Sequence, residues 1–305
     1  MNVASLSERT RPLALVTGSE GFTGHYVTAE LRSAGYDVVG VSHQASEGVL
    51  AADLCDREAM LSVVDATQPD VVVHLAAIAF VAHGDADAIY RTNIVGTRNL
   101  LDALAQSARR PRAVLLTSSA NVYGNSATEI LTEDVTPQPA NDYAVSKLAM
   151  EYMASLWKDR LPIILTRPFN YTGVGQSEKF LLPKIVNHFR RGAKVIELGN
   201  IDVARDFQDV RFVVNAYRRL LEADAIGQTV NLCSGKAHTL TEAIRMMEDI
   251  AGYEIEVRVN PAFVREGEVA RLTGSNQKLA ELIGPLDVIP LRQTLQWMYE
   301  TADSV

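Results

Sequence analysis

Short apolar runs alternate with longer helical patterns through the first half of the chain, and this alternation constrains the fold more than any other feature. Five runs are predicted as strands because they are short and rich in β-branched residues: Leu13–Thr17, Asp37–Val41, Asp70–Leu75, Arg112–Ser118 and Ile163–Arg167. Apolar residues recur at spacings of three and four between them, which predicts four helices: Phe22–Ala34, Arg57–Ala66, Ile89–Ser107 and Tyr143–Trp157. Such alternation forms βαβ units, so we expect an α/β fold with a doubly wound parallel sheet.

Composition and charge exclude several classes of protein. A content of 47% hydrophobic and 22% charged residues is that of an ordinary globular protein. The net charge of -8 argues against nonspecific binding to nucleic acids or anionic membranes. The N-terminal segment MNVASLSERTRP lacks the apolar core of a signal peptide, and no run approaches the ~20 residues of a membrane span. We therefore expect a cytoplasmic protein that binds neither nucleic acid nor membrane.

A glycine pattern joins the first predicted strand to the first predicted helix. The sequence TGSEGFTG, residues 17–24, has the spacing GxxGxxG. Gly18 allows a tight turn, Gly21 lets backbone amides approach a phosphate, and Gly24 lets the helix pack closely on the strand. The helix N-terminus then presents N–H groups and a partial positive charge to a pyrophosphate. An ordinary strand-to-helix turn is the alternative, but the position between strand and helix favours a dinucleotide site.

The end of the second predicted strand bears on the choice of cofactor. NAD-binding chains usually carry a carboxylate there for the ribose 2′-hydroxyl, whereas this chain has Ser42 and His43. Because neither residue carries a carboxylate that would repel a 2′-phosphate, NADP(H) is preferred and NAD(H) is the alternative. Asp53 and Leu54 are candidates to hold the adenine amino group, although Asp53 is equally suited to cap the next helix.

A tyrosine and a lysine four residues apart provide candidate acid–base chemistry. Tyr143 and Lys147 lie one turn apart near the start of a predicted helix, so they share a face. A nearby ammonium favours the phenolate and makes the phenol a usable proton donor or acceptor near neutrality. Ser119 follows the fourth strand, at the carboxyl edge where parallel sheets bind ligands. Its hydroxyl is placed to hydrogen-bond a substrate oxygen.

The motifs TGSEGFTG, HLAA, SSANVYG, YAVSK and RPFN occur in an order and spacing that resemble the extended short-chain dehydrogenase/reductase family. The resemblance covers nearly the whole chain. Residues 167–180, 199–214 and 230–235 are most similar to the members that reduce GDP-4-dehydro-6-deoxy-D-mannose to GDP-D-rhamnose. The resemblance implies a Rossmann dinucleotide-binding domain over residues 1–168, to which part of 206–232 returns, and a smaller C-terminal α/β sugar-nucleotide domain over 169–305.

The resemblance also implies roles for individual residues. Ser119, Tyr143 and Lys147 match the catalytic set. The cofactor positions, which include Tyr143 and Lys147, are further matched by Gly18, Ser19, Glu20, Gly21, Phe22, Gly24, Ser42, His43, Asp53, Leu54, Ala76, Ala77, Thr117 and Pro168. The sugar-nucleotide positions are matched by Ser119, Asn170, Lys179, Arg205, Arg265 and Glu268. The two arginines suit a diphosphate, because the planar guanidinium meets phosphate oxygens bidentately.

One position argues against a related reaction. Dehydratases of this family carry a carboxylate two residues before the tyrosine of the VYG-type motif, where this chain has Asn121. An amide cannot exchange the proton that elimination requires, so ketone reduction is favoured over dehydration. Two alternatives remain: a UDP-sugar 4-epimerase with tightly bound NAD, and a non-catalytic nucleotide-binding regulator on the same fold.

The remaining sequence features give three expectations. The six histidines show no metal-ligand spacing, so no metal site is expected, and His74 is predicted to be a hydrogen-bonded core side chain. Cys55 and Cys233 are expected to be small buried hydrophobes. The resemblance implies a homodimer through Ile89–Ser107 and Tyr143–Trp157, whose outer apolar positions a four-helix contact would bury.

Overall fold

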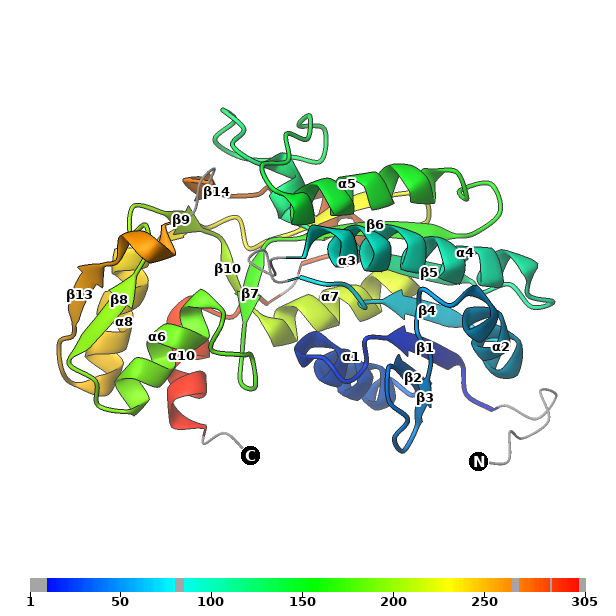
Figure 1. Ribbon diagram of the computed structural model, residues 1–305, viewed down its shortest axis with the longest axis horizontal. Coiled ribbons are helices and arrows are strands. Elements are labelled where there is room, and N and C mark those ends of the chain that lie inside the picture. Colours follow the sequence, from blue (N-terminus) through cyan, green and yellow to red (C-terminus); the bar gives the residue numbers. More distant parts are fainter. Residues whose placement is uncertain (1–9, 80–84, 265–268, 286, 302–305) are drawn as a thin grey trace. The chain divides into compact units, whose positions relative to one another are not determined.

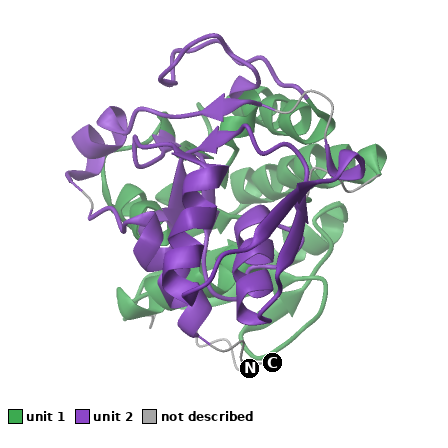
Figure 2. Ribbon diagram, turned by 90° about the vertical axis from the view of Figure 1, so that its left-hand side faces the viewer, with its two compact units in different colours: residues 1–122, 141–167, 214–230 green, residues 123–140, 168–213, 231–305 purple. Residues whose placement is uncertain are grey.

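The computed structural model describes residues 10–79, 85–264, 269–285 and 287–301. The chain forms two compact units (Figure 2). Unit 1 comprises residues 1–122, 141–167 and 214–230, and unit 2 comprises residues 123–140, 168–213 and 231–305. The division of the sequence into domains at residues 168 and 169 stays a prediction.

Unit 1 is built on a seven-stranded sheet whose order is β11-β6-β5-β4-β1-β2-β3 (Figure 1). The strands are β1 (Leu13–Thr17), β2 (Asp37–Ser42), β3 (Val49–Ala51), β4 (Val71–His74), β5 (Ala113–Thr117), β6 (Ile163–Pro168) and β11 (Thr229–Leu232), the last of which continues into unit 2. The pairings from β3 to β6 are parallel. The strand order reverses direction between β1 and β4, which is the point where doubly wound sheets bind their ligands.

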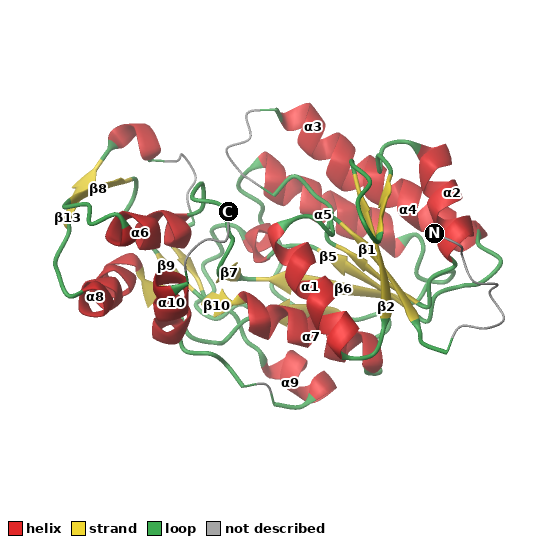
Figure 3. Cartoon of the chain, turned by 90° about the horizontal axis from the view of Figure 1, so that it is seen from below, coloured by secondary structure: helices red, strands yellow, loops and turns green. Residues whose placement is uncertain are grey.

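Helices cover both faces of this sheet (Figure 3). The helices of unit 1 are α1 (Phe22–Ser33), α2 (Arg57–Thr67), α3 (Ala86–Tyr90), η1 (Arg91–Gly96), α4 (Thr97–Gln106), η2 (Ala120–Tyr123, of which 120–122 lie in this unit), α5 (Asp142–Ser155) and α7 (Val210–Glu222, from residue 214). Helices α1 and α7 lie on one face, and α2, α4 and α5 lie on the other. The predicted doubly wound α/β fold is therefore confirmed.

The strands form where the sequence predicts them because both faces of the sheet are buried. Every residue of β1, β4 and β5 is buried, as expected for a parallel sheet covered by helices. One core cluster joins these strands to α2, α4 and α5 through side chains such as Leu15, Val72, Leu100 and Met150. This core fixes the carboxyl ends of the strands, where the candidate functional residues lie.

Several local features of unit 1 differ from the sequence prediction. The helix expected over Ile89–Ser107 begins earlier and is interrupted by a π-helical turn, η1, between α3 and α4. The short strands β3 and β11 were not predicted, because three and four residues carry too little periodicity to distinguish a strand from a loop. Helix α7 was not predicted either. The other predicted elements of unit 1 agree with the structure to within a few residues.

Unit 2 combines three small sheets with helices. Its strands are β7 (Asn170–Thr172), β8 (Val195–Leu198), β9 (Ala204–Arg205), β10 (Phe207–Asp209), β12 (His238–Thr239), β13 (Glu256–Val259) and β14 (Arg271–Leu272). Its helices are α6 (Leu181–Arg190), α8 (Leu240–Ala251), η3 (Pro261–Phe263), α9 (Gln277–Ile283) and α10 (Leu291–Glu300). The apolar faces of α6, α8 and α10 form a separate core that includes Phe189, Met247 and Leu295. No helix among the described residues combines the length and apolar character that crossing a bilayer requires.

Candidate active site

The turn after β1 is shaped by close backbone approach. Gly18 has a positive φ of 69°, and a Cβ there would lie 2.9 Å from the Cα atom and the nitrogen of Ala76, in the loop after β4. A Cβ on Gly24 would collide with the carbonyl oxygen of Gly18. The turn therefore excludes side chains at both positions, and it lies against the loop at the point where the strand order reverses.

The N-terminus of α1 has the character of an anion site. Its N-cap is Gly21, which has no side chain to accept a hydrogen bond from the first turn. Helix α2 differs, because the carboxylate of its N-cap Asp56 accepts from the backbone N–H groups of Glu58 and Ala59. A pyrophosphate suits a glycine-capped helix end of this kind. The turn and the helix end therefore fit the predicted dinucleotide.

Other predicted cofactor residues occupy the same edge of the sheet in different ways. Ser19 is buried and its side chain lies against Gly40 on β2, so only its backbone is available to a ligand. Glu20 is exposed and Phe22 is half-buried. Ser42 ends β2 half-buried, and His43 follows it exposed. No carboxylate stands at these two positions.

Asp53 and Leu54 lie in the loop between β3 and α2. The carboxylate of Asp53 is exposed and accepts the backbone N–H of Cys55, while Asp56 caps the helix. Leu54 is buried and packs against Gly96 at the end of η1. The predicted alternative role of Asp53 as a helix cap is therefore wrong.

His74 ends β4 as a neutral, hydrogen-bonded core residue, as predicted. Its ring nitrogens lie 2.6 Å from Thr17 Oγ1 and 2.8 Å from Thr97 Oγ1. Burial, together with the charge of Lys147, lowers the pKa of His74 to about 3. The imidazole thus supports the β1 and β4 ends without carrying charge. Ala76 and Ala77, which follow it, are half-buried.

Tyr143 and Lys147 are both buried on the first two turns of α5, with 8% and 5% of their surface exposed. Asn141 fixes this helix start, because its side chain accepts the backbone N–H of Ala144. The Lys147 ammonium donates a 2.8 Å hydrogen bond to the backbone carbonyl of Thr117, the last residue of β5. Burial lowers the pKa of Lys147 to about 8, and the carboxylate of Glu151 opposes this shift.

Ser119 follows the same strand end. Its side chain is buried, and its hydroxyl oxygen accepts the backbone N–H of Asn121 at 3.2 Å. The carboxyl end of β5 thus positions both groups: Lys147 binds the carbonyl of Thr117, and Ser119 follows Thr117 by two residues. The arrangement can hold a ligand oxygen near a hydroxyl and move a proton through a phenol beside an ammonium.

Sequence reasoning missed a residue that supports α5. Asn93, in the π-helical turn η1, accepts the backbone N–H of Ile78 and donates to the hydroxyl of Ser146 on α5. Ser146 in turn donates to the carbonyl of Tyr143. The signal in the sequence is a buried polar residue where the helical period expects an apolar one, followed three residues later by Gly96.

The predicted substrate residues of unit 2 are dispersed. Asn170 begins β7 and is exposed, and Lys179 lies exposed in the loop before α6. Arg205 ends β9 half-buried, and one of its Nη atoms donates to the carbonyls of Ala204 and Ala270. Pro168, a predicted cofactor residue, ends β6 and is buried. Two further predicted residues, Arg265 and Glu268, lie outside the described residues.

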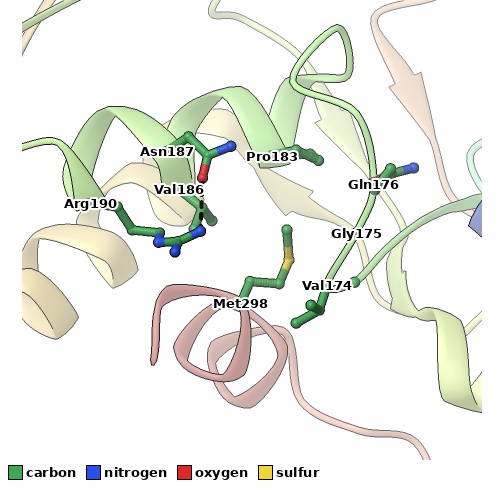
Figure 4. Close-up of a pocket in the computed structure, with 9 residues that line it drawn as sticks. Val174, Gly175, Gln176, Pro183, Val186, Asn187, Arg190 and Met298 are labelled. Atoms are coloured by element: carbon green, nitrogen blue, oxygen red, sulfur yellow. Dashed lines mark hydrogen bonds between the residues drawn. The ribbon is translucent and has the colours of Figure 1, made fainter. Parts of the chain in front are cut away.

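Unit 2 also contains a small open pocket between α6, α10 and the loop after β7 (Figure 4). Arg190 donates a 3.3 Å hydrogen bond to Asn187 at one end, and Met298 of α10 points into the middle. The pocket is lined by Gly173, Val174, Gly175, Gln176, Pro183, Val186, Asn187, Arg190 and Met298. Of the predicted substrate residues that the structure describes, none lines it. Within the described part of the chain, no three metal-ligating side chains come together.

Comparison with known proteins gives consistent results. The model of the family described as "NAD dependent epimerase/dehydratase family" matches residues 14–233. GDP-6-deoxy-D-talose 4-dehydrogenase of Aggregatibacter actinomycetemcomitans is 33% identical over 290 residues, which are 94% of this chain and 96% of the relative. GDP-6-deoxy-D-mannose reductase of Pseudomonas aeruginosa is 35% identical over 294 residues, which are 92% and 94% of the two chains.

Solved structures share the fold over the same span. A crystal structure of a candidate epimerase from Burkholderia cenocepacia J2315 has a TM-score of 0.89 and 53% identity, and the match covers 95% of this chain and 97% of that one. RMD from Pseudomonas aeruginosa, solved in complex with NADPH, has a TM-score of 0.84 and 32% identity, with coverage of 95% and 96%.

Proposed function

The chain belongs to the NAD dependent epimerase/dehydratase family, and within that family we propose that it reduces the C4 ketone of GDP-4-dehydro-6-deoxy-D-mannose to give GDP-D-rhamnose. Family membership confirms the resemblance inferred from the sequence motifs, and the homologues are NAD(P)-dependent sugar-nucleotide oxidoreductases. The observation that carries the proposal is the full-length similarity to two GDP-6-deoxyhexose enzymes in a chain that keeps Tyr143 and Lys147 buried on α5, with Lys147 bound to the end of β5.

The side chains of unit 1 have distinct roles in this proposal. Ser119 donates a hydrogen bond to the C4 carbonyl oxygen and orients it. Tyr143 protonates the alkoxide that forms at that oxygen, a step that contributes typically 10²–10⁴-fold to the rate. Lys147, anchored on the Thr117 carbonyl, supplies a positive charge that stabilises the phenolate left after proton transfer. Ser119 and Lys147 share the end of β5, and Tyr143 lies one turn from Lys147 on α5, which supports placing all three groups in one reaction.

The cofactor, when bound, supplies a hydride to C4 from its reduced nicotinamide. We assign its pyrophosphate to the turn of Gly18, Gly21 and Gly24 and to the start of α1, because close backbone contacts exclude a Cβ atom at Gly18 and at Gly24. We propose NADP(H) over NAD(H), because Ser42 and His43 offer no carboxylate against a 2′-phosphate. The NADPH complex of RMD supports this preference.

The sugar nucleotide is assigned to residues of unit 2. Arg205 and Arg265 are proposed at the diphosphate, because guanidinium groups bind phosphate oxygens bidentately. Asn170, Lys179 and Glu268 complete the proposed set. Asn121 disfavours dehydration of the same sugar, since an amide cannot act as the acid or base of elimination.

A second product is favoured by one of the comparisons. The relative from Aggregatibacter is named for 6-deoxy-D-talose, which differs from D-rhamnose in its configuration at C4. Hydride delivery to the opposite face of the same ketone would give GDP-6-deoxy-D-talose. The same residues would serve both products, because only the orientation of the sugar changes.

The proposal is tested by incubating the protein with NADPH and GDP-4-dehydro-6-deoxy-D-mannose and following NADPH absorbance. NMR of the product assigns its C4 configuration. We expect stoichiometric NADPH oxidation, with Tyr143→Phe as the inactive control. Conversion of a UDP-hexose with retained NAD and no added reductant would instead identify a 4-epimerase. Nucleotide binding without turnover of any activated keto-sugar would identify a regulator.

We also propose a homodimer through two segments of unit 1: Ile89–Ser107, which contains η1 and α4, and Tyr143–Trp157, which contains most of α5. Tyr152 on α5 and Leu156, the C-cap residue of this helix, are 68% and 79% exposed, and Val145 on α5 and Val95 on η1 are exposed as well. A second copy would bury these apolar side chains in a four-helix contact. We expect light scattering to give a dimer for the wild type and a monomer for Leu156→Glu. A wild-type monomer at micromolar concentration would contradict the proposal.

We place the reaction in the cytoplasm. The proposed cofactor and substrate are both multiply charged nucleotides, which a bilayer excludes. Fractionation of cells that produce the protein tests this, with activity expected in the cytoplasmic fraction.

A further inference from the structure

A buried ion pair lies one turn beyond Lys147 on the face of α5 that carries Tyr143 and Lys147. Glu151 follows Lys147 by one turn, so the three side chains share one stripe of the helix. Arg167 on β6 donates from Nε and Nη2 to the two carboxylate oxygens of Glu151, at 2.9 and 2.7 Å. Both side chains are only 8% exposed. This two-point contact fixes the carboxylate against α5.

A buried ion pair contributes little to the free energy of unfolding compared with well-packed apolar side chains. Removing two charges from water costs free energy that their attraction only partly returns, and apolar replacements are often neutral or stabilising. The pair between Glu30 and Arg218, which joins α1 to α7, is by contrast partly exposed on both sides. The buried position of Glu151 beside a candidate catalytic lysine therefore suggests a task in the reaction.

Among the described residues, the carboxylate of Glu151 is the negative charge that acts on Lys147. On its own helix Lys147 lies one turn from Tyr143 and one turn from Glu151. Its ammonium donates a hydrogen bond to the uncharged carbonyl of Thr117 on β5, and the nearby His74 on β4 is neutral. The cation on β6, Arg167, is bound to both oxygens of Glu151.

We propose that Glu151 is a positioning residue that keeps the Lys147 ammonium protonated, and that Arg167 holds the Glu151 carboxylate in place for this purpose. The role of Lys147 in catalysis rests on the proposed function, whereas its protonation does not. Burial lowers the pKa of Lys147 to about 8 and Glu151 raises it. Without the carboxylate, the lysine would lose its proton nearer to neutral pH, where Tyr143 requires the charge.

The test measures the pKa of Lys147 in the cofactor-free protein. The folded pKa of about 8 lies below the ordinary value of 10.5, so between these pH values the unfolded chain binds more protons than the folded one. The free energy of unfolding contributed by Lys147 must therefore rise with pH, beginning near pH 8. Urea unfolding of the wild type and of Lys147→Met across pH 6–11 isolates this rise, since all other groups are shared.

The same comparison is then made in a Glu151→Gln background. We expect the rise to begin about one pH unit lower, as it should when an opposite charge is lost. Glu30→Gln, which breaks the partly exposed pair with Arg218, is the matched control and should leave the onset at the wild-type pH. An onset that does not move in Glu151→Gln would overturn the proposal.

A double variant guards against loss of folding. Glu151→Gln removes the carboxylate from the buried Arg167 guanidinium, and loss of one member of a buried ion pair strongly destabilises proteins. In Glu151→Met combined with Arg167→Met, apolar side chains replace both charges and the core stays filled. The lowered onset should persist in this variant, because the carboxylate is absent. An onset restored to the wild-type pH would show that the pair is only structural.

Binding gives a second readout. In a Tyr143→Phe background, NADPH affinity should weaken as pH rises through the pKa of Lys147, and the Glu151 variants should shift this weakening to lower pH by the same amount. Affinity curves that coincide for Glu151→Gln and wild type would count against the proposal. If GDP-4-dehydro-6-deoxy-D-mannose is not reduced at all, the proposed function fails, but the cofactor-free measurement still decides the role of Glu151.

Discussion

The two units present their candidate functional groups in different ways. In unit 1 the groups come from short contiguous motifs, and each is fixed by the end of a parallel strand: the glycine turn by β1, Ser119 by β5, and Lys147 by its bond to Thr117. In unit 2 the candidates Asn170, Lys179 and Arg205 lie on three separate elements and are exposed or half-buried.

The difference follows from the architecture of each unit. The strands of a parallel sheet all end at the same edge of the sheet. Residues that directly follow these strands therefore lie near one another because of the fold itself. The small sheets of unit 2 have two or three strands each and share no such edge. Chemistry is therefore expected to depend on unit 1, whereas unit 2 is expected to set affinity for the sugar nucleotide.

The sharpest way to break this comparison is Tyr143→Phe. Loss of the phenol removes the proposed proton donor, so kcat should fall about 10³-fold. NADPH affinity should change little, since the aromatic ring remains buried on α5. Stopped-flow kinetics and fluorescence titration measure the two quantities. Unchanged turnover would remove Tyr143 from the mechanism and with it the assignment of chemistry to unit 1.

The fold of unit 1 was largely predictable from the sequence, because its buried strands are uniformly apolar and its helices keep a clear period. The prediction located Leu13–Thr17 without error, and it placed the ends of β4 and β5 within one residue. It missed η1, since a π-helical turn changes backbone hydrogen bonds without changing the apolar pattern. The three residues of β3 were too few to show alternation.

The candidate site was predictable only where residues are close in sequence. Tyr143 and Lys147 share a helix, so their spacing was enough to place them on one face. The partnership of Lys147 with Thr117, and of Glu151 with Arg167, joins residues 30 and 16 positions apart. No local pattern encodes such pairs, because they depend on which strand the helix packs against. In unit 2 the hydrogen bond of Arg205 to Ala270 has the same non-local origin.

The pH dependence of turnover sharpens the assignment to unit 1. The proposed reduction requires a proton on Tyr143 and a positive charge on Lys147, and the pKa of Lys147 is about 8. We expect kcat/KM to be level below this pH and to fall about tenfold per unit above it. NADPH consumption at saturating cofactor from pH 6 to 10 measures this. A rate that rises with pH over this range would show that the lysine acts in its uncharged form.

Gly24→Ala tests whether the cofactor turn depends on backbone packing. The added methyl group would collide with the Gly18 carbonyl, so we expect a loss of about 2 kcal/mol in unfolding free energy, with weaker NADPH binding. Ser33→Ala, at the exposed far end of α1, is the control and should change neither quantity measurably. Urea unfolding and NADPH titration provide the measurements. Normal stability and affinity in Gly24→Ala would mean that the turn tolerates a side chain.

Arg205→Lys is the smallest predicted change and tests unit 2 directly. Lysine keeps the charge but loses the planar group that meets two phosphate oxygens, so KM for the GDP-sugar should rise about tenfold, or about 1.4 kcal/mol. The value of kcat should stay within about twofold, because no proposed proton-transfer group belongs to unit 2. Arg191→Lys, an exposed partner of Glu178 on the surface of unit 2, is the matched control. A fall in kcat with unchanged KM would place Arg205 in the chemical step, and the separation of chemistry from affinity between the two units would then be wrong.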